Sequence, residues 1–321
     1  GVGSRALCAN TTGTKNVAVG YNTLSTNVTG DNNTAVGVEA AFKTTAGDNT
    51  AIGSSALRCN IGGCFNSALG THALYYNTTG QSNTGLGRGA LCCNTIANNN
   101  TGVGRNAGQC NTSGAQNTGI GSSALMGYGG TVTGSDNTGV GYFAAGKTTS
   151  GTGNTSVGAR SLCTNTTSSY NTAVGYCALL TNNGAYNTAV GVVSLCSNTT
   201  GSCNTVIGYA LKNNSTASGN TAIGSSALKL NTTGANNTAV GCDVLRNNTT
   251  GSANVASGQC SMQENIAGSC NVALGYRTLT NATSACNNTA IGNQVLYSNT
   301  TGIDNIGMGP SSLRGNTTGN Q

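Results

Sequence analysis

The residues that could carry out acid–base, nucleophilic or metal chemistry are few and scattered in this sequence. His72 is the single histidine, so a Ser–His–Asp or Cys–His pair would have to use it. The seven acidic residues form no close pair of the kind that flanks the bond cleaved by a glycosidase. The cysteine spacings match no zinc motif with a histidine partner, and no phosphate-binding loop occurs. The sequence therefore predicts no enzyme, no metal site and no cofactor.

The element that must position every side chain is a short repeat. The phrase Asn-Thr-Ala-Val-Gly recurs along the whole chain, and its last glycine, here called position 0, is spaced by a mean of 17 residues from Gly3 to Gly309. Position −4 is Asn in every complete repeat, −1 is almost always aliphatic and +4 is mostly Leu. An Asn-Thr-Thr-Gly turn signal occupies about +7 to +10. We expect one repeat domain over residues 1–321, with an insertion around 127–133.

The composition narrows the fold class. Gly (50 of 321 residues), Asn and Thr dominate, whereas aromatic residues amount to 4%, charged residues to 6%, and proline to a single residue. Gly, Asn and Thr are poor helix formers, and collagen would need abundant proline. No apolar run approaches the roughly 18 residues of a membrane span. A repeat of this length suits one coil of an all-β solenoid with two short strands and two turns, and about 19 such coils would stack at about 4.8 Å.

The conserved columns predict roles within each coil. Position 0 needs positive φ or close backbone approach, and Asn at −4 is expected to form a ladder between coils. Thr at −3 shares a face with −1, and −2 takes the opposite face. Two arrangements remain open. In one, the small −2 residues line a thin interior while −1 packs against a neighbouring chain. In the other, −1 and +4 share the interior and −2 lies on the surface.

These repeats, such as Asn33-Thr34-Ala35-Val36-Gly37 and Asn171-Thr172-Ala173-Val174-Gly175, resemble the head repeats of trimeric autotransporter adhesins. They are also similar to Asn-Thr-Ala-Val-Gly-rich repeats of phage and viral fibre-like proteins. The resemblance covers the whole chain and implies a β-roll or β-solenoid at a cell or particle surface, often trimeric, with an adhesive or spacer role. The adhesin repeat is shorter and carries few cysteines, whereas this chain has 14.

The cysteines favour an oxidising compartment and candidate disulfides. Residues stacked on successive coils lie about 4.8 Å apart, within the Cα range of a disulfide, and other pairs flank a turn within one coil. Buried free thiols are the alternative. The candidate pairs are Cys93 with Cys110, Cys242 with Cys260, Cys270 with Cys286, Cys59 with Cys64, and Cys196 with Cys203.

The turn column also creates Asn-x-Thr/Ser sequons. In a secreted protein these asparagines are candidate glycan acceptors on exposed turns, although the turn motif produces a sequon by itself. The candidates are Asn10, Asn27, Asn77, Asn111, Asn165, Asn198, Asn231, Asn248, Asn299 and Asn316.

We expect a structural component of an extracellular fibre or surface filament, located outside the cell or on a particle. Neither end carries a polar cap, which favours a segment of a longer chain or end-to-end stacking. The expected partner is the chain itself, with glycans or a host surface as further candidates, and no nucleic acid or membrane span. An adhesive head or receptor-binding fibre segment is the alternative, and it predicts aromatic or charged residues clustered over several coils, for which Arg58, Arg88 and Arg105 come closest. A column of threonines at −3 makes ice binding a minor alternative.

Overall fold

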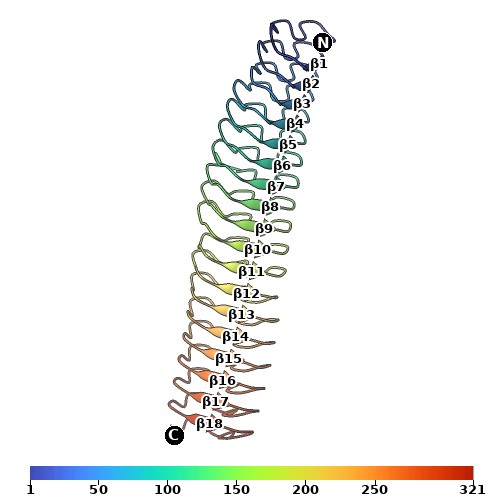
Figure 1. The fold of residues 1–321 in the computed structure, drawn as a ribbon. Coiled ribbons are helices and arrows are strands. Elements are labelled where there is room, and N and C mark those ends of the chain that lie inside the picture. Colours follow the sequence, from blue (N-terminus) through green and yellow to red (C-terminus); the bar gives the residue numbers. More distant parts are fainter. Residues whose placement is uncertain (321) are drawn as a thin grey trace. The chain divides into compact units, whose positions relative to one another are not determined.

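The structure is a computed structural model that describes residues 1–320. Its contacts group the chain into two compact units, Gly1–Ser168 and Ser169–Gln321, each of which we describe by itself. The expectation of a single repeat domain stays a prediction. Both units are all-β solenoids, as the sequence predicts, and no α-helix occurs among the described residues. Figure 1 follows the strands, one to a coil, along each unit.

Every strand has three residues, at positions −3 to −1, and the strands of each unit pair in parallel with the next coil. In the first unit they are β1 (Val17–Val19), β2 (Thr34–Val36), β3 (Thr50–Ile52), β4 (Ser67–Leu69), β5 (Thr84–Leu86), β6 (Thr101–Val103), β7 (Thr118–Ile120), β8 (Thr138–Val140) and β9 (Thr155–Val157). In the second they are β10 (Thr172–Val174), β11 (Thr188–Val190), β12 (Thr205–Ile207), β13 (Thr221–Ile223), β14 (Thr238–Val240), β15 (Val255–Ser257), β16 (Val272–Leu274), β17 (Thr289–Ile291) and β18 (Ile306–Met308).

The register keeps equivalent residues in columns. Ala35 pairs with Ala51 although the step between their coils is one residue short. The longer step of the insertion also leaves the register intact, because Gly119 pairs with Gly139. The extra residues are taken up outside the strand, where Val132 forms an isolated bridge with Asn111. Changes in repeat length are therefore absorbed in the turns, as the sequence analysis predicts.

The segment around +3 and +4 is a turn, so the expectation of a second strand in each coil is wrong. Residues at +2 and +4 adopt the left-handed region, as in Asn22 (φ 54°) and Leu24 (φ 48°). A positive φ interrupts an extended strand, but the segment still forms backbone hydrogen bonds to the neighbouring coils. The Asn22 N–H donates to Ser4 O of the preceding coil, whereas the Leu24 N–H donates to Ala40 O of the following coil.

The glycine at position 0 is required on two grounds, both visible at Gly37. Its φ is +134°, and an added Cβ would come within 2.6 Å of the Gly53 carbonyl oxygen in the next coil. Residues that carry a Cβ rarely adopt that backbone conformation. The predicted need for positive φ and close backbone approach is confirmed.

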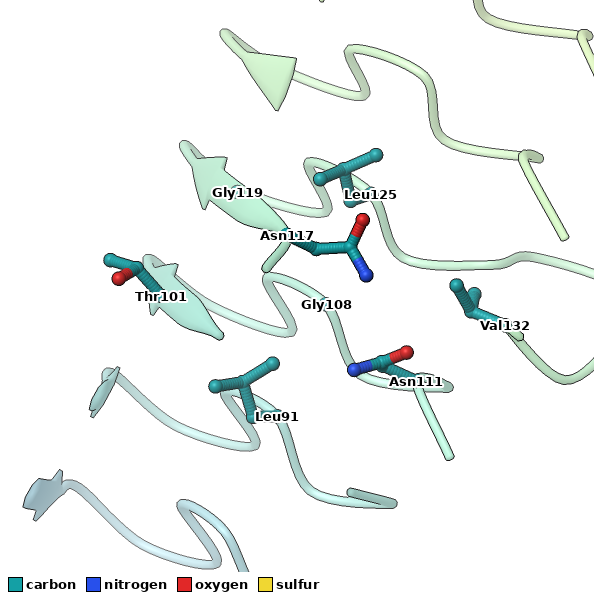
Figure 2. A pocket seen from close by; sticks show the side chains of 8 residues that line it. All are labelled: Leu91, Thr101, Gly108, Asn111, Asn117, Gly119, Leu125 and Val132. Atoms are coloured by element: carbon teal, nitrogen blue, oxygen red, sulfur yellow. The ribbon is translucent and has the colours of Figure 1, made fainter. Parts of the chain in front are cut away.

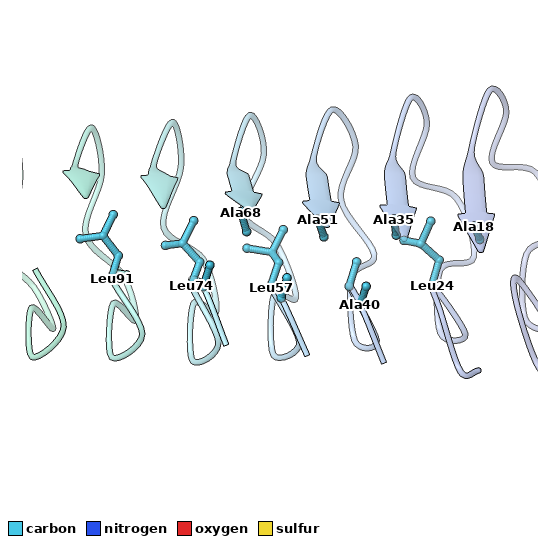
Figure 3. Packing of buried hydrophobic residues seen from close by; sticks show 12 residues of the cluster. Ala18, Leu24, Ala35, Ala40, Ala51, Leu57, Ala68, Leu74 and Leu91 are labelled. Atoms are coloured by element: carbon cyan, nitrogen blue, oxygen red, sulfur yellow. The ribbon is translucent and has the colours of Figure 1, made fainter. Parts of the chain in front are cut away.

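The interior contains the −2 and +4 columns. In Figure 3 leucines such as Leu24, Leu57 and Leu74 lie beside the strand alanines, and Leu24 and Ala35 are fully buried. The −1 residues point outward, so the arrangement with −2 inside is the one observed. An alanine or glycine at −2 leaves room for the leucine, because facing large and small residues interdigitate at native packing density.

The Asn ladder at −4 is present. Asn83 Oδ1 accepts a hydrogen bond from the Asn100 N–H at 3.0 Å, and Asn83 Nδ2 donates to Ala97 O at 2.8 Å. Asn66 Oδ1 accepts in turn from the Asn83 N–H at 3.0 Å. Because these groups are buried, each amide satisfies backbone atoms that would otherwise lack partners.

Candidate functional site

The most extensive candidate interaction surface is the outward face of the strands. We call it the outer stripe and define it as the −3 and −1 residues of β1–β9 in the first unit and of β10–β18 in the second. The pleat of the strand turns −2 inward and leaves these two columns outside. The −1 side chains are substantially exposed, for example Ile52 at 37% and Leu69 at 43%.

The outer stripe carries no charge. The chain has 13 Lys/Arg and 7 Asp/Glu residues, yet none occupies a −3 or −1 position of the eighteen strands. Its residues are Thr, Ser, Val, Ile, Leu and Met, repeated at about 4.8 Å along each sheet. Contiguous exposed apolar side chains can mark an interaction surface, which makes this face a candidate site.

The threonines of the stripe leave their hydroxyls available. Among the described residues, no threonine at −3 forms a side-chain hydrogen bond within the chain, whereas turn threonines such as Thr78 and Thr95 donate to the next coil at 2.9 Å. The predicted Thr column at −3 therefore lies outside with free hydroxyls. Its neighbour at −1 is aliphatic, so the surface alternates hydroxyl and methyl columns.

The sequon asparagines lie inside the solenoid, which corrects the expectation that they occupy exposed turns. Asn77 is fully buried, and its Nδ2 donates both to Asn60 Oδ1 of the preceding coil at 2.8 Å and to Gly80 O at 2.9 Å. A glycan on Nδ2 would replace one of these bonds and would have no space. The same column holds eight buried candidates, Asn27, Asn77, Asn111, Asn165, Asn198, Asn231, Asn248 and Asn299, whereas Asn10 and Asn316 of the terminal coils are half-buried.

This column is a second Asn ladder that the sequence analysis missed. Asn94 Nδ2 donates to Asn77 Oδ1 at 2.7 Å, and Asn248 Nδ2 donates to Asn231 Oδ1 at 2.7 Å. Each amide also closes its own turn by bonding the backbone three residues later. A signal was available, because a residue required only for a turn could alternate freely with Asp or Ser, while this column keeps Asn in most coils, with Thr44, Thr148 and Ala282 among the exceptions.

The ten cysteines of the five predicted disulfides are free thiols in the structure, so none of these pairs is bonded, namely Cys93–Cys110, Cys242–Cys260, Cys270–Cys286, Cys59–Cys64 and Cys196–Cys203. Stacking in register explains why Cα proximity is insufficient. This reason applies to Cys93 and Cys110, which share the +6 column: side chains of one column run parallel, so their Cβ atoms stay about as far apart as the coils, beyond the 3.5–4.5 Å usual for a disulfide.

One group of thiols is electrostatically coupled. The Cys92 thiol donates a hydrogen bond to Cys93, which lowers the pKa of Cys93 to about 7 and raises that of Cys92. Burial, followed by the nearby Cys93, raises the pKa of Cys110. The lowered pKa favours the thiolate form of Cys93 over those of Cys92 and Cys110.

The remaining titratable residues do not assemble into a catalytic or metal-binding cluster within residues 1–320. His72 is exposed, at the variable +2 position, and contacts Tyr75 edge-on with ring centroids 5.3 Å apart. No group of three His, Cys, Asp or Glu residues able to hold a metal occurs in that range. Arg58 lies at +5, outside the +1 column of Arg88 and Arg105. Its guanidinium pairs with the Glu39 carboxylate at 2.7 Å.

The interior offers no ligand cavity of useful size at the point where the leucine column is interrupted. Gly108 replaces leucine between Leu91 and Leu125, and Figure 2 shows the small space that these residues and Asn111 line. Its volume is about 10 Å³, the space of a single water molecule at most. The buried Asn111 Oδ1 has no hydrogen-bond partner there.

Across the described residues, no helix has the length and apolar character needed to cross a bilayer. A scan against protein-family models gives no match, and a search of curated proteins gives none either.

Proposed function

We propose that this chain is a structural component of an extracellular fibre or surface filament whose protomers associate through the outer stripe. The observation that carries the proposal is an uncharged face of aliphatic and threonine columns on a chain whose charged residues all lie elsewhere. A second copy of the same face is a suitable partner. It supplies methyl groups against methyl groups, and its threonines can exchange hydrogen bonds with threonines across the contact.

The energy available matches the cost of association. Full burial of an aliphatic side chain is worth about 1.5–3 kcal/mol, so residues about two-fifths exposed, such as Leu86 at 40%, each retain about 0.6–1.2 kcal/mol. The six −1 residues of the first unit that are exposed to about this extent then offer about 4–7 kcal/mol. Association costs about 4–15 kcal/mol, so the stripe of one unit gives weak association.

The test places charge on the stripe and beside it. In the double variant Ile52→Lys/Leu69→Lys, two −1 residues of β3 and β4 become lysines. The matched control Ser54→Lys/Thr71→Lys adds the same charges at the exposed +1 positions of the same coils. Light scattering over a concentration series is expected to give an oligomer for the parent and the control, and the 31.6 kDa monomer for the stripe variant.

Two results would contradict the proposal. One is a parent chain that stays monomeric at every concentration, which would leave the stripe facing water and make ice binding, measured as thermal hysteresis, the next experiment. The other is a stripe variant that keeps the parent's mass, which would place any self-association elsewhere.

An adhesive head or receptor-binding fibre segment is the second candidate, and a specific observation favours it. Aromatic and cationic residues gather over successive coils of the first unit, where Arg58 stacks between Phe42 and Tyr75. A purely structural protein does not require such a cluster. The two candidates are compatible, because the cluster lies on the turns at +5 and +6 and the stripe lies on the strands.

A further inference from the structure

A groove runs across five successive coils of the first unit, between the +6 and +8 columns of the turns. Its volume is about 440 Å³. Because the coils repeat at about 4.8 Å, it extends roughly 19 Å along the stacking direction. One wall consists of Lys43, Cys59, Tyr76 and Cys93, and the other of +8 side chains that include Thr78 and Thr95.

A second hollow adjoins the groove at Tyr76. It has a volume of about 280 Å³ and is lined by His72, Tyr75, Tyr76 and Cys92. The Tyr75 and Tyr76 rings meet edge-on with centroids 4.6 Å apart, and Tyr76 is 50% exposed. Tyr76 therefore presents an aromatic surface to both hollows, flanked by the polar edge of His72.

The aromatic platform is held in place by the coils beneath it. The Arg58 guanidinium lies 5.2 Å from the Phe42 ring centroid and 5.7 Å from that of Tyr75. Glu39 fixes the same guanidinium through a contact of 2.7 Å. Tyr75 is thus packed before any ligand arrives, and a preorganised platform loses little side-chain entropy on binding.

The charge around the groove favours an anionic ligand. Lys43 is exposed in the groove wall, and Glu39 is already paired with Arg58. No Asp or Glu occurs between Asp48 and Asp136, a span that contributes most of the groove and three arginines. A carboxylate or sulfate in the groove therefore meets a cation and no opposing carboxylate.

We propose that this groove binds an extended acidic polysaccharide, with a sugar ring stacked on Tyr76 and an acidic group near Lys43. Amphipathic rings such as those of tyrosine offer an apolar face and a polar edge, which suits a sugar that has C–H faces and hydroxyl edges. The groove presents one +6 side chain per coil, so it admits a polymer whose repeat is close to one coil, as in an extended chain of linked sugar rings.

A peptide strand fits the groove less well. Side chains on one face of a strand repeat at about 6.6 Å, out of step with the coils. The backbone N–H groups of the groove wall are also committed, since those of Thr78 and Thr95 donate to the next coil. A peptide would therefore find no free backbone edge for strand addition.

The test uses the reduced full chain with two readouts. Soluble alginate oligosaccharides are the acidic probe, and laminarin oligosaccharides, which are neutral, are the matched control. Binding is measured by calorimetry for the parent, for Tyr76→Ala and for Tyr186→Ala, which removes an exposed tyrosine from the other unit. The second readout is the rate at which iodoacetamide alkylates Cys93 in the groove, compared with the exposed Cys203 of the other unit.

The acidic probe is expected to bind the parent and Tyr186→Ala, to bind Tyr76→Ala about tenfold more weakly, and to slow alkylation of Cys93 but not of Cys203. Absence of binding, or binding that neither protects Cys93 nor depends on Tyr76, would overturn the proposal. Equal binding of laminarin would refute the acidic assignment. Equal binding of single-stranded DNA would show a non-specific electrostatic contact and would also overturn it. The parent's oligomeric state is a separate measurement, so this proposal and the structural proposal can fail independently.

Discussion

Removal of one interior asparagine should cost a large part of the local stability. In Asn83→Ala, the Ala97 carbonyl loses its donor at 2.8 Å and the Asn100 N–H loses its acceptor at 3.0 Å. Asn94 Nδ2 still donates to the Ala97 carbonyl at 3.1 Å, so the Asn100 N–H is the buried backbone group left without a partner. A buried backbone group without a partner costs about 1–3 kcal/mol, so we expect a loss of about 1–3 kcal/mol. A comparable alanine substitution on the surface changes stability by less than about 0.5 kcal/mol.

The substitution Asn83→Asp removes the amide donor but keeps the side-chain volume, so it separates the two effects that Asn83→Ala combines. The new carboxylate would face the Asn66 and Ala97 oxygens without solvent, so its pKa in the folded protein should be raised above the ordinary 3.9. The folded state then holds the proton more tightly than the unfolded state. Stability is therefore highest below pH 3.9 and falls as the pH rises through the interval between the two pKa values.

The assay combines urea unfolding with hydrogen exchange, because coils of a repeat protein can open locally. The Asn100 amide should exchange faster in Asn83→Ala than in the parent. Asn99→Asp is the control, since Asn99 is exposed and donates only its backbone N–H. The reasoning fails if Asn83→Ala unfolds within about 1 kcal/mol of the parent with unchanged Asn100 exchange, or if Asn83→Asp shows no more pH dependence than the control.

Three further outcomes follow from the columns and the thiols. Leu228→Ala should lower the free energy of unfolding in urea by about 2–5 kcal/mol because Leu228 is fully buried. Leu230→Ala, at an exposed position two residues later, should lower it by less than about 1 kcal/mol. Cys92→Ala removes the thiol donor, so the pKa of Cys93 should rise and its alkylation rate at pH 7 should fall about tenfold in mass-spectrometric labelling; an unchanged rate would exclude that hydrogen bond. If the chain is secreted by a glycosylating host, peptide mapping of the folded product should find Asn77 unmodified, and a glycan there would contradict its place in the interior ladder.

Much of the coil was predictable from spacing, because stacking in parallel register makes residues of one type recur at one position. The positive φ of Gly37 and the −4 ladder at Asn83 follow from that logic. The direction in which the −1 side chains point could not be predicted from the spacing. Alanine at −2 and valine at −1 are both acceptable interior residues, and only the arrangement of Leu24 against Ala35 decides between them.

Two features escaped sequence reasoning for a physical reason. Leu57 at φ 52° occupies a region that bulky side chains rarely enter, so nothing in its residue type indicated a turn in place of a strand. Asn77 has the residue type of an exposed turn but closes a buried one, because stacked amides satisfy one another in the interior. The outer stripe was predictable as a set of columns, but its exposure required the inward direction of the −2 residues.

The most direct test of the central claim is cryo-electron microscopy of the purified full chain. The account predicts protomers in side-by-side contact through the strands, with the −1 columns covered by a neighbouring copy and a coil repeat near 4.8 Å. The images should be recorded at the concentrations used for light scattering. Separate protomers whose −1 columns face solvent would contradict the assignment of the outer stripe as the surface of self-association.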